Sequence, residues 1–73
     1  MNEIREKCYF DLIYFFENNI IAFYQYCVII KQLNNYSPRL IRFCLVELEE
    51  KNLIIKTAYG RQIFYMRKKL KER

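Results

Sequence analysis

The chain has 73 residues, of which 53% are hydrophobic and 29% are charged, and its 13 lysines and arginines outnumber its 8 acids. This length holds one domain, and the apolar content with a single Gly and a single Pro excludes disordered, collagen-like and low-complexity chains. The seven Tyr and six Phe residues are more than one small core easily covers, which favours a homodimer.

No membrane segment or export signal is predicted. The longest apolar stretch, residues 20–30, is interrupted by Gln25 and is shorter than the roughly 20 residues that a membrane helix needs. The first seven residues lack the basic stretch, apolar run and small-residue cleavage site of a signal peptide. We therefore expect a soluble intracellular protein with no membrane contact.

The cysteines and the absent histidine limit the possible chemistry. Cys8, Cys27 and Cys44 include no C-x-x-C pair, so the spacings of zinc sites and redox dithiols are missing, and we expect no metal or other cofactor. The simplest interpretation is three buried core thiols, and a disulfide within or between protomers is the alternative. Without a histidine base, a Gly-rich phosphate loop or a G-x-S-x-G motif, we expect neither an enzyme nor a small-molecule site.

A first helix is predicted over residues 2–17, where apolar residues recur at helical spacing before Asn18 and Asn19 stop the pattern. The stripe expected to face the core comprises Ile4, Cys8, Leu12, Phe15 and Phe16. A second apolar stripe, on another side of this helix, comprises Phe10, Ile13 and Tyr14. This second stripe is the candidate dimer interface, and coverage by another segment of the same chain is the alternative.

A second helix is predicted over about residues 23–33, where the i, i+3, i+4, i+7 spacing is filled by Tyr26, Ile29, Ile30 and Leu33. Its start is open. Asn19 could cap a helix that begins at Ile20, or residues 20–22 could form a short extended piece that leads into a helix from about Phe23.

A third helix is predicted over residues 38–51. Ser37 suits the N-cap, Pro38 suits the first helical position, and Asn52 suits the left-handed residue after a helix end. The stripe expected to face the core comprises Leu40, Ile41, Cys44, Leu45 and Leu48. The opposite face, with Arg42 on one flank, comprises Arg39, Phe43, Val46 and Glu50.

The C-terminal part is predicted to be a β-hairpin over residues 53–66. Both arms, residues 53–57 and 61–66, are rich in β-branched and aromatic residues, and the intervening turn at residues 58–60 contains the only Gly. A basic tail follows over residues 67–73. The elements together predict an α+β domain over residues 1–73, with three helices and a two-stranded hairpin.

The positive charge belongs to the C-terminal half. Residues 1–36 carry three bases and four acids, whereas residues 37–73 carry ten bases and four acids. Clustered positive charge attracts polyanions, and DNA phosphates give the largest electrostatic gain because their binding releases counterions. Double-stranded DNA is therefore the expected partner.

The order of elements resembles a known family. Three helices and a hairpin, with the run Leu-Glu-Glu-Lys-Asn-Leu-Ile at residues 48–54 closing the third helix, resemble the winged helix-turn-helix domain of MarR-like and ArsR-like transcriptional regulators. Asn52 stands where the family usually has Gly, and Asn tolerates the same left-handed geometry. The composition is also similar to that of small winged-helix proteins from viruses of thermophilic archaea.

The resemblance implies a sequence-specific regulator, acting as a homodimer, whose third helix enters the major groove while its hairpin wing touches the adjacent backbone or minor groove. The helix residues that would meet phosphates or base edges are Ser37, Arg39 and Arg42. The hairpin residues that would contact phosphate or sugar are Lys56, Tyr59 and Arg61. Phe43 would contact thymine methyl groups or a partner protein, and the sequence does not decide between them.

A second hypothesis makes the same fold a protein-interaction module, whose outer apolar residues Phe43, Val46, Phe10 and Tyr14 bind another polypeptide. The two hypotheses differ in salt response, because DNA binding weakens steeply with salt and an apolar interface does not. RNA is a third possibility, although the hairpin aromatics Tyr59, Phe64 and Tyr65 match no RNA-binding motif.

Overall fold

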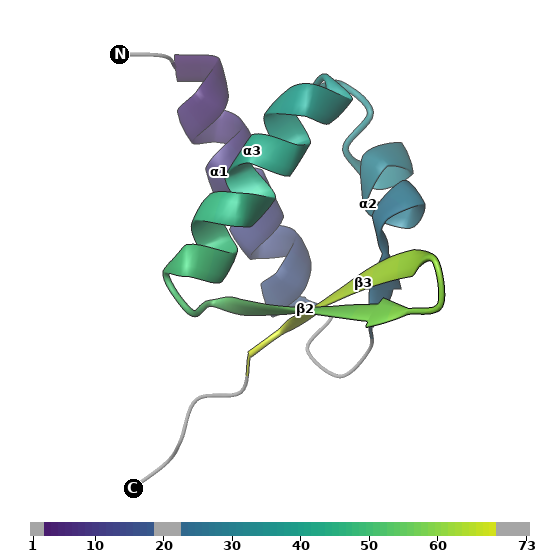
Figure 1. Ribbon diagram of the computed structural model, residues 1–73. Helices are drawn as coiled ribbons and strands as arrows, with labels where there is room; N and C mark the ends of the chain where they lie inside the picture. The colour runs from purple at the N-terminus through teal and green to yellow at the C-terminus, as the bar shows by residue number, and fades with distance from the viewer. Residues whose placement is uncertain (1–2, 19–22, 69–73) are drawn as a thin grey trace, which may run out of the picture.

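The structure is a computed structural model that describes residues 3–18 and 23–68. These residues form an α+β fold of three helices and a three-stranded antiparallel sheet (Figure 1). The helices are α1 (Glu3–Glu17), α2 (Tyr26–Gln32) and α3 (Pro38–Glu50). The strands are β1 (Tyr24–Gln25), β2 (Ile54–Tyr59) and β3 (Gln62–Arg67), and they lie in the order β1-β3-β2.

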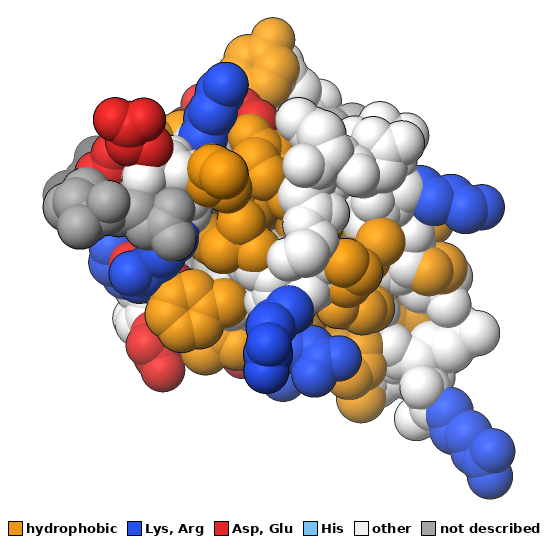
Figure 2. Space-filling model, turned by 90° about the horizontal axis from the view of Figure 1, so that it is seen from above, with side chains coloured by type: hydrophobic (Ala, Val, Ile, Leu, Met, Phe, Trp, Pro, Cys, Tyr) orange, Lys and Arg blue, Asp and Glu red, His pale blue; other side chains and the backbone are white. Residues whose placement is uncertain are grey.

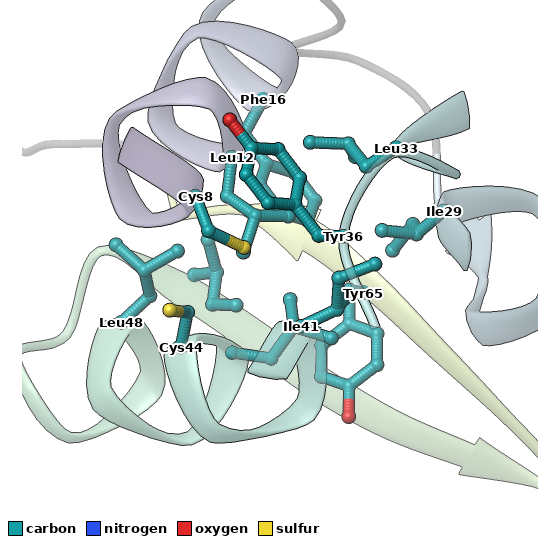
Figure 3. Packing of buried hydrophobic residues seen from close by; sticks show 12 residues of the cluster. Cys8, Leu12, Phe16, Ile29, Leu33, Tyr36, Ile41, Cys44, Leu48 and Tyr65 are labelled. Carbon is teal, nitrogen blue, oxygen red and sulfur yellow. The ribbon is translucent and has the colours of Figure 1, made fainter. Parts of the chain in front are cut away.

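The core lies where α1 and α3 pack together over the sheet. The two helices bury one stripe each: Cys8, Leu12 and Phe16 on α1, and Ile41, Cys44, Leu45 and Leu48 on α3. Figure 3 shows the labelled side chains of these stripes meeting between the helices, with Ile29 of α2 and Leu33, the residue after α2, beside them. Each large aliphatic side chain removed from water in this way contributes about 1.5–3 kcal/mol.

The α1 stripe is narrower than predicted. Ile4 is 60% exposed, because it lies in the first turn of the helix and about 80° around the axis from Leu12. Phe15 and, on α3, Leu40 are partly buried and pack against the rim of the core. The centre of each predicted stripe is thus buried, and its edges are only half covered.

Helix α2 begins at Tyr26, three residues after the predicted start, because the chain is extended over Tyr24–Gln25. This short strand pairs with β3, with Tyr24 opposite Tyr65 and Gln25 opposite Phe64. The strand exists through pairing with a distant segment, so the local pattern gave no signal for it. The two alternatives for residues 19–22 lie outside the described residues.

Both ends of α3 match their sequence signals. The Ser37 hydroxyl oxygen accepts the backbone N–H of Leu40 at 3.1 Å, and Pro38 occupies the first helical position. Asn52 has φ +63°, and the backbone N–H groups of Asn52 and Leu53 donate to the carbonyls of Glu49 and Leu48. This pair of bonds is a Schellman motif, which satisfies the free carbonyls of the last turn and directs the chain into β2.

The β2–β3 hairpin turns through Gly60 and Arg61, since Tyr59 pairs with Gln62. The turn therefore has two residues and not the predicted three (58–60), and it begins two residues later. Gly60 has φ +63°, which a two-residue turn requires at its first position. Because side chains alternate across a strand, Lys56 shares the face of buried Ile54, which is the face toward α3.

The predicted basic tail begins inside the sheet. Arg67 is the last residue of β3, and the backbone N–H of Lys68 donates to the Leu53 carbonyl at 3.0 Å. Residues 69–73 of the tail lie outside the described residues.

Candidate nucleic-acid interface

A groove of about 550 Å³ lies between α3, the start of α2 and the β2–β3 hairpin. Three of the predicted DNA-binding cations line it, namely Arg42, Lys56 and Arg61, and no acidic residue of the described chain does. The three cations come from a helix, a strand and a turn. The fold brings them to one groove. The hairpin passes beneath α3 toward α2 (Figure 1).

The position of each cation follows from its local structure. Arg42 lies on the flank of α3, about 100° around the axis from the buried Ile41. Lys56 stands opposite Tyr65 in the hairpin register, on the face that continues from the core into the groove. Arg61 is the second residue of the turn, so its side chain reaches the groove from the hairpin tip.

The groove cations have no acidic partner among the described residues. Within residues 3–18 and 23–68, no ion pair forms at Arg42, Lys56 or Arg61. The Arg42 guanidinium instead lies over the ring of Tyr26, with its Cζ atom 5.8 Å from the ring centroid. Unpaired arginine and lysine side chains of this kind are suited to contact phosphate oxygens.

Tyr65 connects the core to the groove. Tyr65 is only 6% exposed, but its hydroxyl points away from the other labelled core side chains (Figure 3). Burial raises the pKa of this hydroxyl, and Glu49 and Tyr26 act in the same direction, whereas Arg42 lowers it. The hydroxyl therefore stays neutral at physiological pH and can donate a hydrogen bond at the groove floor.

The opposite flank of α3 holds paired charges. Arg5 of α1 and Lys51 each lie 3.4 Å from a carboxylate oxygen of Glu47. The Arg5 guanidinium also covers the ring of Phe43, with Cζ 4.5 Å from the ring centroid. Lys51 donates to the Tyr9 hydroxyl at 3.1 Å, and this bond together with Glu47 raises the pKa of Lys51. These contacts join α3 to α1.

The other predicted DNA-binding residues lie outside the groove lining. Ser37 caps α3, and Arg39 is exposed on the outer face of the helix without an ion pair to any described residue. Phe43 lies under Arg5, as described above. Tyr59 is 76% exposed, and strand alternation directs it to the hairpin face opposite Lys56. The fold thus gathers three of the seven predicted residues.

Charged side chains are spread over the face seen in Figure 2. Lys and Arg side chains appear at several places on this face, some of them adjoining one another, with hydrophobic side chains nearby and Asp and Glu side chains toward the left. Among the exposed apolar residues of α3 are Phe43 and Val46, and Val46 also lines the groove. A mixed surface of this kind can contact both phosphates and the apolar edges of bases.

Sequence reasoning did not assign Tyr26 and Cys27 to the site, although both line the groove. The helical spacing predicted Tyr26 as a core residue, and it does pack against the core. Tyr26 also lines the groove because α2 begins late, which brings the first turn of this helix beside α3.

The predicted dimer stripe divides into two parts. Phe10 and Tyr14 are 60% and 71% exposed on the outer side of α1. Ile13 is half-buried and packs against the core, where it borders a small recess of about 60 Å³ with Leu53 and Ile54. For Ile13 the alternative from the sequence is therefore correct, because other segments of the same chain cover it.

The three cysteines are free, and they occupy two environments. Cys8 and Cys44 are buried between α1 and α3, and Cys44 Sγ donates to the Arg5 carbonyl at 3.8 Å. Burial raises the pKa of Cys8 to about 12 and also raises the pKa of Cys44. Cys27 is exposed, so the prediction of three buried thiols is wrong for this residue.

Two features are absent from the described residues. No helix among them has the length and apolar character needed to cross a bilayer. The same residues contain no cluster of three or more potential metal ligands.

Comparison with protein-family models, with curated proteins and with solved structures finds no match to this chain.

Proposed function

We propose that this chain is a winged helix-turn-helix protein that binds double-stranded DNA and regulates transcription. The observation that carries the proposal is the convergence of Arg42, Lys56 and Arg61 on one groove that no acidic residue of the described chain lines. The order of helices and strands and the hairpin beside α3 support the fold assignment. The resemblance of residues 48–54 to the regulator families points in the same direction.

In this proposal the backbone of the duplex lies along the groove. Arg42, Lys56 and Arg61 contact phosphates, which fixes the orientation of α3 on the duplex. The first half of α3 then approaches the major groove, where the exposed Arg39 is suited to bidentate contact with guanine. Acidic residues lie in the second half of the helix, away from this approach, and Glu47 is already paired with Arg5 and Lys51.

The proposed regulator is a homodimer. Phe10 and Tyr14 lie one turn apart on α1 and are largely exposed, so a second copy of the chain is the proposed cover for them. Two copies related by a two-fold axis would read two half-sites of a palindromic operator. Sedimentation at increasing concentration tests this part of the proposal, with a change of Tyr14→Lys expected to favour the monomer.

The test of DNA binding is a titration of labelled random-sequence duplex with the unaltered chain, repeated over a series of salt concentrations. Three phosphate contacts per chain, from the groove cations, predict a slope of log affinity against log salt of about −3. A single-stranded probe of the same sequence is the comparison. Absence of binding, or binding that does not weaken with salt, would contradict the proposal.

The exposed apolar residues favour one other function. Phe43, Val46, Phe10 and Tyr14 are each at least 43% exposed, which is the property expected of a protein-interaction module. An interface of that type would persist at high salt and would lose affinity when Val46 is changed to Asp. Duplex binding with the predicted salt slope decides between the two functions.

A further inference from the structure

We infer that Tyr26 is a positioning residue of the duplex-binding groove, because its ring holds the Arg42 guanidinium over the groove without neutralising it. This inference rests on the proposed function and adds to the site a residue that does not itself need to touch DNA.

The ring of Tyr26 is fixed on two sides. Tyr26 is the first residue of α2, and its half-buried side chain packs against the core. Its hydroxyl donates to the Pro38 carbonyl at 3.4 Å, in the first turn of α3. Arg42 is four residues after Pro38, so the same ring contacts the beginning of α3 and the side chain one turn later.

An aromatic ring and a carboxylate have different effects on the charge of an arginine that they hold. The face of an aromatic ring attracts the guanidinium through its quadrupole, and the positive charge remains available to a further partner. A carboxylate at the same place would cancel that charge. Arg5 illustrates the second case, since it contacts both the Phe43 ring and the carboxylate of Glu47.

Holding Arg42 in place before DNA arrives raises affinity. A free arginine side chain loses rotamer freedom when it binds phosphate, and this loss opposes binding. Contact with a fixed ring removes part of that freedom in the unbound chain. Tyr26 is therefore expected to increase duplex affinity only as long as Arg42 is present.

A double-mutant cycle on duplex affinity at one salt concentration tests this dependence. The four proteins are the unaltered chain, Tyr26→Leu, Arg42→Ala and the double variant, and Tyr26→Phe is the matched control that keeps the ring but loses the hydroxyl. We expect Tyr26→Leu to weaken binding about two- to fivefold in the presence of Arg42. The same change should have no effect in the Arg42→Ala background. Tyr26→Phe, which keeps the ring and its packing against the core but loses the hydrogen bond to Pro38, should weaken binding less than Tyr26→Leu does.

The outcomes separate the two proposals. If the unaltered chain fails to bind duplex DNA, the proposed function fails, and this inference fails with it. If the unaltered chain binds but Tyr26→Leu weakens binding equally with and without Arg42, or has no effect, this inference alone is overturned. Proton NMR of the unaltered chain gives a readout that does not depend on the folding of any variant. An upfield ring-current shift of the Arg42 side-chain protons is expected, and their normal position would overturn the inference.

Discussion

The cations beside the two flanks of α3 differ in whether they form ion pairs within the fold. On the flank toward α1, Arg5 and Lys51 share the carboxylate of Glu47 and contact aromatic side chains. On the flank toward the hairpin, Arg42, Lys56 and Arg61 line a groove and form no ion pair with any described residue. The comparison teaches that net charge alone does not locate a binding surface. Charges whose partner lies within the fold hold helices together, and charges left without one are available to a polyanion.

The cysteines also differ between the two sides of α3. The largest effect that we expect is the difference in their alkylation rates. Cys8 and Cys44 lie on the α1 side and react only after the core opens, whereas Cys27 is exposed beside the groove. Alkylation of the native chain by iodoacetamide, followed by mass spectrometry, should modify Cys27 more than about 100-fold faster than the other two. Denaturant should make all three equal. Similar native rates would contradict the buried α1–α3 contact.

The next effect concerns duplex affinity. Changing Arg42 and Arg61 together to Ala removes two unpaired groove charges, so affinity at low salt should fall about 10- to 100-fold and the salt slope should become shallower by about two. The matched control changes Lys7 and Lys31, two exposed lysines that do not line the groove, to Ala. Equal losses for the two pairs would mean that the chain binds DNA through its net charge and not through the groove.

On the α1 side, Tyr36 is expected to affect stability and not DNA binding. Its hydroxyl donates to the Asp11 carboxylate, and this bond, together with burial, raises the pKa of Tyr36 to about 12. Removing a hydrogen bond to a charged partner by Tyr36→Phe should cost about 1.5 kcal/mol of stability at neutral pH.

The pH dependence of the same variant gives a second readout. Because the folded pKa of Tyr36 exceeds the unfolded value near 10, the contribution is complete below pH 10 and is lost between pH 10 and 12. Denaturant melts over this range should therefore fall less steeply with pH for Tyr36→Phe than for the unaltered chain. Parallel curves would show that the bond to Asp11 does not stabilise the fold.

The smallest expected effects are those of Glu47→Gln, which should lower stability and raise duplex affinity. Glu47→Gln removes the carboxylate that holds Arg5 and Lys51, so the melting temperature should fall by a few degrees. The released cations should raise duplex affinity about threefold at low salt. A variant that is less stable but binds DNA no better would show that the paired cations lie too far from the duplex to contribute.

The sequence predicted those features that depend on neighbouring residues. Ser37, Pro38 and Asn52 set the two ends of α3 through local hydrogen bonds, and the periodic stripe of this helix identified its buried face. Arg42 was likewise predicted on the flank of α3 from helical geometry. Local chemistry was sufficient for these features because each involves residues within one or two turns.

Features that depend on distant pairing were not predictable. Strand β1 has two residues and exists because Tyr24 meets Tyr65, and its presence delays α2 and moves Tyr26 and Cys27 to the groove. The cover of Phe43 by Arg5 arises from the packing of α1 against α3, which no spacing within either helix indicates. Ile13 is half-buried for the same reason, since it packs against a core to which other elements contribute.

The most direct test of the groove uses Cys27 as a natural reporter. Cys27 lines the groove with Arg42, Lys56 and Arg61, so a bound duplex should slow alkylation of its thiol in proportion to the fraction of protein in complex, and high salt should restore the free rate. Complex formation with an unchanged rate at Cys27 would contradict a duplex seated in the groove.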